Sequence, residues 1–84
     1  MKNKVLINLF VPSIDSSYEI YIPVNESVKK VLELLVKSVV ELSDGALDLR
    51  VGHYLMDPDA GIIYNDTQII RDTNIKNSKK IVLI

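Results

Sequence analysis

The residue types that most often carry chemistry in proteins are sparse in this chain of 84 residues. It has no cysteine, which removes thiol catalysis, thiolate metal sites and disulfides together. Its one histidine, His53, is not accompanied by a nucleophile-elbow pattern such as Gly-x-Ser-x-Gly, so a serine triad is not indicated. We interpret His53 as a strand or loop residue at a partly exposed position. We therefore expect no catalytic residue and no enzymatic activity.

Three aspartates lie in or near a predicted turn and are candidate ligands for calcium: Asp57, Asp59 and Asp66. An EF-hand loop beginning at Asp57 needs glycine at its sixth position and an acidic residue at its twelfth, but these positions hold Ile62 and Gln68. Aspartate is also typical of ordinary turns, and that interpretation is favoured here. The three glycines are scattered and form no phosphate-cradling loop. We expect neither a bound metal nor a cofactor.

The composition argues against further classes of function. The formal net charge is −1, with no basic excess for phosphate contacts, so we expect no nucleic-acid partner. No segment approaches the ~20 apolar residues that span a bilayer, so direct membrane insertion is not expected. The N-terminal residues lack the pattern of a signal peptide, and together with the absence of cysteine this favours a cytoplasmic location. The length indicates one domain over residues 1–84.

Hydrophobic periodicity predicts two strands followed by a helix. Residues 4–11 are rich in β-branched residues, residues 18–24 alternate, and the short connection between these two strands predicts an antiparallel hairpin. Asn25 or Ser27 can cap a helix that runs to about residue 42. Its expected buried stripe consists of Val28, Val31, Leu32, Leu35, Val36 and Val39. Its expected solvated face consists of Lys29, Lys30, Glu33, Lys37 and Glu41. Gly45 is suited to a left-handed cap at the end of this helix.

The second half of the chain predicts shorter elements. Residues 46–52 are either a loop or a short extra turn, and residues 53–56 and 62–64 are expected strands. Residues 67–74 connect, with one helical turn, to a last strand over 80–84. So few strands cannot sandwich the helix, so we expect an α+β fold, with one helix on a mixed sheet of four to five strands. With the first and last strands parallel at its centre, this is the β-grasp arrangement.

The end of the chain resembles ubiquitin, in the run from Ile70 to Ile75 (Ile-Arg-Asp-Thr-Asn-Ile), the short polar turn after it and the apolar last strand. The first strand Val5-Leu6-Ile7-Asn8-Leu9 and the helix start Val28-Lys29-Lys30-Val31 resemble the small bacterial ubiquitin-like proteins of the YukD/EsaB kind. This resemblance implies an accessory or regulatory component of a type VII secretion system in Gram-positive bacteria. It also implies protein partners, among them a membrane-bound secretion component.

Three alternative functions differ in what they require of the chain. A ubiquitin-like carrier needs an accessible Gly-Gly end, whereas the sequence ends in Val82-Leu83-Ile84, so conjugation is not expected. A structural homodimer needs only an unpaired sheet edge. An interaction module needs an exposed apolar surface.

Strand alternation predicts where such a surface lies. If the helix covers the face that carries Val5, Ile7 and Leu9, the intervening residues must point to the open face of the sheet. The residues that we expect to form a protein-binding patch there are Leu6, Phe10, Tyr21, Val82 and Ile84. Ubiquitin's partner-binding surface lies on the corresponding face.

Overall fold

The computed structural model describes residues 3–84, and it begins with the predicted antiparallel hairpin. Strand β1 spans Lys4–Val11 and strand β2 spans Ser16–Pro23, two residues earlier than predicted at its start. They pair along their whole length, from Lys4 opposite Pro23 to Val11 opposite Ser16. A 3₁₀ turn at Pro12–Ile14 reverses the chain, and Asp15 takes the left-handed conformation with φ 50°. Proline at the start of the turn and aspartate at its left-handed end match the conformations that these residues tolerate.

Helix α1 spans Val28–Leu42, as predicted. The Ser27 side chain accepts a hydrogen bond from the Lys30 backbone N–H over 3.1 Å and caps the N-terminus. At the other end, Gly45 N–H donates to the Val40 carbonyl and Asp44 N–H donates to that of Glu41, which is the Schellman arrangement. The first left-handed position is therefore Asp44, with φ 55°, and Gly45 follows it with φ 82°.

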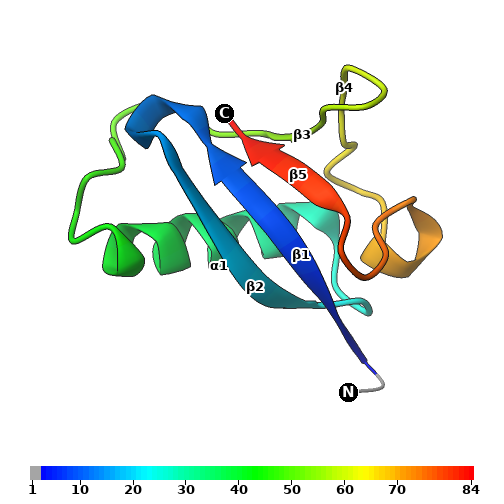
Figure 1. The fold of residues 1–84 in the computed structure, drawn as a ribbon. Helices are drawn as coiled ribbons and strands as arrows, with labels where there is room; N and C mark the ends of the chain where they lie inside the picture. The colour runs from blue at the N-terminus through cyan, green and yellow to red at the C-terminus, as the bar shows by residue number, and fades with distance from the viewer. Residues whose placement is uncertain (1–2) are drawn as a thin grey trace.

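Three short strands and a second 3₁₀ turn complete the fold. Strand β3 spans Leu55–Asp57, β4 spans Ile62–Ile63, the 3₁₀ turn η2 spans Ile70–Asp72 and β5 spans Lys80–Leu83. The five-stranded sheet has the order β2-β1-β5-β3-β4. Strands β1 and β5 are parallel neighbours at its centre, and all other pairs are antiparallel. Helix α1 crosses one face of this sheet (Figure 1). The predicted β-grasp fold is confirmed.

The core lies between α1 and the facing side of the sheet. Ile7, Leu9 and Val11 of β1 alternate into it, and Ile81 and Leu83 of β5 do the same. Four of the predicted helix positions, Val28, Val31, Leu35 and Val39, are fully buried, whereas Leu32 and Val36 are only partly buried. Residues 46–52 form an irregular segment without a helix, anchored by the buried Leu47. Within residues 3–84, no helix combines the length and hydrophobicity that crossing a bilayer requires.

Candidate protein-binding surface

The side of the sheet turned away from α1 carries a row of apolar side chains that crosses four strands. Phe10 of β1 lies beside Val82 of β5, Val82 lies opposite Met56 of β3, and Met56 lies opposite Ile63 of β4. Each of the first three alternates with residues that are buried under the helix, so their side chains point to the open face. The row is built by strand register alone, because adjacent strands place directly paired side chains next to one another.

Tyr54 and Ile84 add a second row on the same face. They lie just outside β3 and β5 and exchange two backbone hydrogen bonds, Tyr54 N–H to the Ile84 carbonyl at 2.8 Å and Ile84 N–H to the Tyr54 carbonyl at 2.9 Å. This pairing continues the β3–β5 ladder by one position, so both side chains lie two residues from the first row and share its face. Both side chains are exposed.

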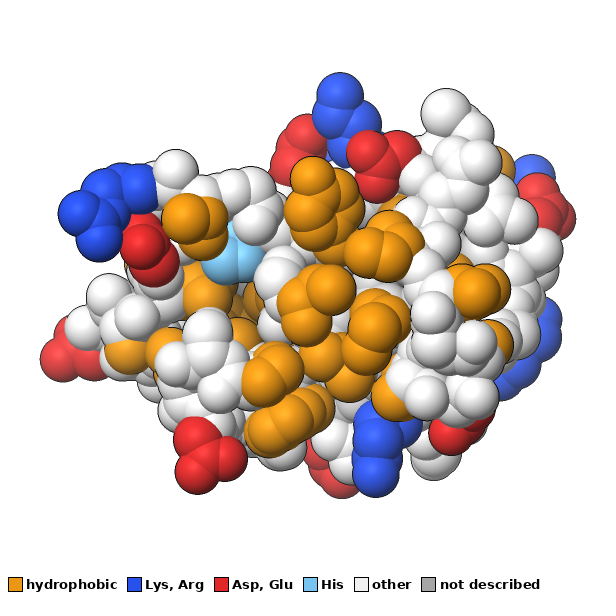
Figure 2. Space-filling view, turned by 90° about the horizontal axis from the view of Figure 1, so that it is seen from above, with side chains coloured by type: hydrophobic (Ala, Val, Ile, Leu, Met, Phe, Trp, Pro, Cys, Tyr) orange, Lys and Arg blue, Asp and Glu red, His pale blue; other side chains and the backbone are white. Residues whose placement is uncertain are grey.

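We call these six residues the outer patch: Phe10, Tyr54, Met56, Ile63, Val82 and Ile84. Seen from the side of β3, β4 and the C-terminal end of β5, hydrophobic side chains gather over the centre and most charged side chains lie toward the edge (Figure 2). A contiguous apolar surface of this kind on a small domain usually marks an interaction site.

The structure brings three of the five predicted patch residues together and places two elsewhere. Phe10, Val82 and Ile84 belong to the outer patch. Leu6 and Tyr21 are paired with each other across β1 and β2, but the next row on this face, Asn8 opposite Glu19, separates them from Phe10. The five residues therefore do not form one continuous apolar row, and the binding role expected of them stays a prediction. Val82 does point outward, yet its neighbours leave only 7% of it exposed.

Sequence reasoning missed Tyr54, Met56 and Ile63. The predicted strand over residues 53–56 carried no assignment of its faces, and the observed β3 and β4 have three and two residues. Strands of two or three residues are too short to show which residues alternate to which face. The exposed aliphatic pair Ile62–Ile63 next to a turn was the one available signal.

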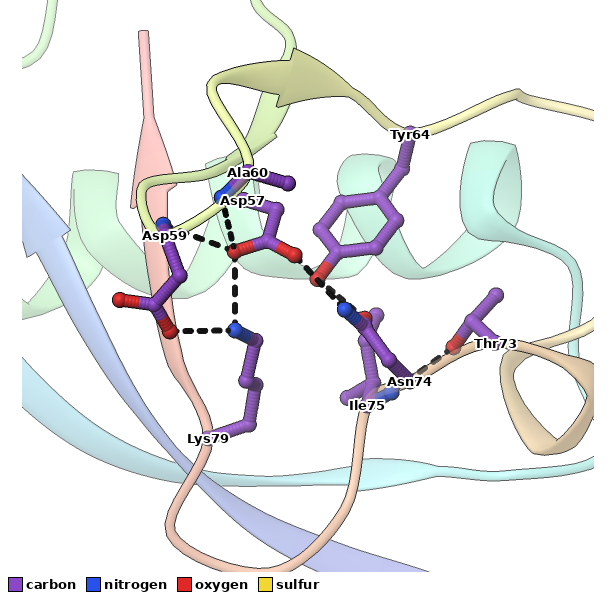
Figure 3. A network of polar contacts seen from close by, with 8 residues as sticks. All are labelled: Asp57, Asp59, Ala60, Tyr64, Thr73, Asn74, Ile75 and Lys79. Carbon is purple, nitrogen blue, oxygen red and sulfur yellow. Dashed lines mark hydrogen bonds and ion pairs between the residues drawn. The ribbon is translucent and has the colours of Figure 1, made fainter.

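Beside the outer patch, a polar network centred on Asp57 holds the β3–β4 turn against the chain before β5 (Figure 3). The Asp57 carboxylate is buried and accepts hydrogen bonds from Lys79 Nζ at 2.8 Å and from Asn74 Nδ2 at 2.7 Å. It also accepts from the backbone N–H of Asp59 at 3.0 Å, as expected of a turn residue. The Tyr64 hydroxyl donates to Asn74 Oδ1 at 2.7 Å.

These contacts move the pKa values of the network away from neutrality. The hydrogen bond from Lys79 is the main reason that the pKa of Asp57 lies well below its usual range, and the hydrogen bond from Asn74 lowers it further. The same pair, with Asp59, raises the pKa of Lys79 above its usual range. A group that acts as an acid or base at neutral pH needs a pKa near 7, so neither residue is suited to that role. The network is best understood as an anchor for the turn.

The three aspartates that were weighed as calcium ligands do not converge on one site. The Lys79 ammonium lies between the carboxylates of Asp57 and Asp59, at 2.8 Å and 2.9 Å, where a metal would have to bind. Asp66 is exposed and takes no part in this network. Among residues 3–84, no three histidine, cysteine or acidic side chains come together in a way that could hold a metal ion. His53 is half-buried, and its Nε2 donates to the Asp48 carbonyl at 2.8 Å.

Comparison with known proteins defines the fold and not a family. No protein-family model and no curated protein matches the sequence. Among solved structures, the ubiquitin-like domain of the Mycobacterium tuberculosis type VII secretion protein EccD1 is similar, with a TM-score of 0.75 and 9% identity, covering 96% of this chain and 97% of that one. The EccD5 ubiquitin-like domain from Mycobacterium xenopi gives a TM-score of 0.72 at 10% identity, covering 96% and 92%.

A chain of a structure described as toluene 4 monooxygenase HD complex with inhibitor 4-bromobenzoate is also similar, with a TM-score of 0.76 at 11% identity, covering 95% of both chains. Identities this low carry no information about activity, so they establish the architecture only. The protein is thus a ubiquitin-like β-grasp domain. Its structural neighbours include the ubiquitin-like domains of type VII secretion proteins.

Proposed function

We propose that this protein is a non-catalytic interaction module that binds a partner protein through the outer patch. The observation that carries the proposal is the apolar row from Phe10 through Val82 and Met56 to Ile63, on the sheet face that α1 leaves open. Burying such a row against a partner removes apolar surface from water at about 25 cal/mol per Å². The exposed Tyr54 in the neighbouring row offers the large, rigid contact that is typical of interface anchors.

We further propose that the partner belongs to a type VII secretion system and that the module acts in the cytoplasm as an accessory or regulatory component of the YukD/EsaB kind. The EccD1 and EccD5 domains support this proposal because the same architecture occurs in proteins of that system. A chain of the MycP5-free ESX-5 inner membrane complex gives further support, with a TM-score of 0.72 and 15% identity over 98% of this chain and 21% of that one. In that complex the fold is one part of a larger protein.

Deletion of the gene in the source organism tests this role. The proposal predicts that secretion of the substrates of the type VII system falls and that the wild-type chain supplied in trans restores it. A chain with Ile63→Lys, expressed at the wild-type level, should restore it poorly. Normal secretion in the deletion strain would contradict the assignment to this system, while leaving the interaction surface itself open to direct measurement.

Two alternatives make different predictions. A ubiquitin-like carrier would gain mass as a C-terminal adenylate, thiocarboxylate or conjugate when incubated with activating enzymes, whereas the proposed module keeps its mass. A structural homodimer through a sheet edge would form without a partner, and one through the β2 edge would not depend on Ile63, which lies on the opposite edge strand β4.

A further inference from the structure

A groove separates α1 from the irregular segment that follows it. Its volume is about 520 Å³, which is within the range of binding sites in proteins. The apolar residues of its walls are Leu32, Val36, Val40 and Leu49, and His53 also lines it. The view from above shows a hollow beside the histidine, coloured pale blue, with hydrophobic side chains at its floor (Figure 2).

The groove exists because α1 is apolar over a wider arc than the core uses. Val28, Val31, Leu35 and Val39 are fully buried against the sheet. Leu32, Val36 and Val40 follow at helical spacing and point to one flank, where they are only partly buried. The segment over 46–53 passes along this flank but inserts only Leu47 into the core. This second apolar row is therefore only partly covered.

A regular pattern of charge runs along α1 beside the groove, where Glu33, Lys37 and Glu41 line it and Lys29 precedes them by one helical turn. Lys29, Glu33, Lys37 and Glu41 recur every four residues, so they form one alternating row along α1, and all four are exposed. In the part of the chain that the structure describes, the ion pairs join Asp48 to Arg50 and Lys79 to Asp57 and Asp59. The alternating row takes part in none of them, so its charges are open to an outside partner.

This row is complementary to itself when it is reversed. In two antiparallel copies of α1, Glu33 lies opposite Lys37 of the second copy, and Lys29 lies opposite its Glu41. Every cation then faces an anion. In the parallel arrangement with the same residues aligned, every charge faces its own kind. The pattern therefore selects one orientation, as charged flanking residues do in paired helices.

We propose that the groove binds a second copy of this chain, with the two α1 helices antiparallel about a two-fold axis. The partly buried rows of both helices, from Leu32 to Val40, face each other, and the two exposed Leu49 side chains become covered. A two-fold interface of this kind uses the same surface on both copies, as the self-complementary row requires. The groove lies on the helix side of the sheet and the outer patch on the other, so this proposal goes beyond the function proposed above and is independent of it.

The first test is the oligomeric state of the purified chain, measured by sedimentation equilibrium from about 10 μM to about 1 mM at low salt. We expect a monomer–dimer equilibrium in this range for the wild type and no dimer for Val36→Asp. Leu34→Asp is the matched control, because it makes the same kind of change on the opposite flank of α1, where Leu34 is exposed. Circular dichroism shows whether each variant is folded. A wild type that remains monomeric throughout would overturn the proposal.

Charge reversal provides a second test that does not touch the apolar residues. Glu33→Lys alone should weaken the dimer by about tenfold, because two symmetry-related attractive pairs become repulsive. Lys37→Glu alone should have a similar effect. The double variant Glu33→Lys/Lys37→Glu restores both pairs and should dimerise as the wild type does. If the double variant is as weak as the single variants, the antiparallel arrangement is wrong.

Discussion

The carboxylate of Asp57 and the ammonium of Lys79 lie 2.8 Å apart although 22 residues separate them in the sequence. Asp57 is the last residue of β3, and Lys79 directly precedes β5. Their contact ties the β3–β4 turn to the central strand, and β4 carries one end of the outer patch. The ion pair thus holds Ile63 in its place beside Met56.

The ion pair gives folding stability a predictable dependence on pH. Because the folded-state pKa of Asp57 is lowered, its contribution is fully present above about pH 4 and is lost as the pH falls further. Because the pKa of Lys79 is raised, its contribution is fully present below about pH 10 and is lost as the pH rises through the raised value. Burial raises the pKa of Tyr64, and the charge of Asp57 raises it further. The raised pKa of Tyr64 adds to the loss of folding stability in alkali.

Urea unfolding over a pH series checks this account with Asp57→Asn as the comparison. The variant should be less stable than the wild type at pH 7. The difference should shrink below about pH 4, because Asp57 then takes up a proton in the unfolded wild-type chain while it remains ionised in the folded one. A difference that is constant from pH 7 to about pH 2 would mean that the charge of Asp57 does not contribute.

Loss of Lys79 should destabilise the protein more than loss of Asp59. Lys79→Met removes the cation from the buried Asp57 carboxylate and leaves that charge with amide donors only. Asp59→Asn removes an exposed partner of the same ammonium, and exposed ion pairs contribute little. Thermal unfolding should therefore show a clear decrease in midpoint for Lys79→Met and almost none for Asp59→Asn. Equal decreases would assign the stabilisation to Asp59.

The C-terminus of α1 offers a pair of substitutions with opposite expected effects. Gly45→Ala should lower the free energy of unfolding by about 1 kcal/mol, because alanine is strained at φ 82° although its Cβ meets no atom within 4 Å. Asp44→Gly should raise it by about 0.5 kcal/mol, because glycine tolerates the left-handed conformation at φ 55° better than aspartate. Chemical denaturation measures both. A stabilising Gly45→Ala would contradict the positive φ of Gly45 described above.

The sequence was sufficient to predict the elements that have long periodic patterns. The eight residues of β1 and the fifteen of α1 contain several periods of alternation or helical repeat, so their faces could be assigned. The parallel pairing of the first and last strands was expected on the condition that they are neighbours at the centre of the sheet, as the resemblance to ubiquitin implied, and the structure has this pairing. The three residues of β3 contain too few alternations to set a register, and for this reason Tyr54 and Met56 were missed.

The differences between the predicted patch and the outer patch have separate physical causes. Alternation correctly placed Leu6 on the same face as Phe10, but it does not restrict distance, and four residues of strand span about 13 Å. Val82 faces outward on a strand near the centre of the sheet, where Phe10 and Met56 flank it and cover it. The turn role of Asp57 was predictable from composition, whereas its pairing with Lys79 depends on tertiary structure that no local pattern contains.

The central claim is that the outer patch binds a partner protein, and the two residues of β4 test it most directly. Ile62 and Ile63 are 55% and 50% exposed and point to opposite faces of the sheet. Tagged chains with Ile63→Lys and with Ile62→Lys would be used to capture partners from source cells in mild detergent, beside the wild type, with folding checked by circular dichroism. We expect Ile62→Lys to recover the same membrane secretion component as the wild type and Ile63→Lys to recover about tenfold less or none. Equal recovery by both variants would contradict it.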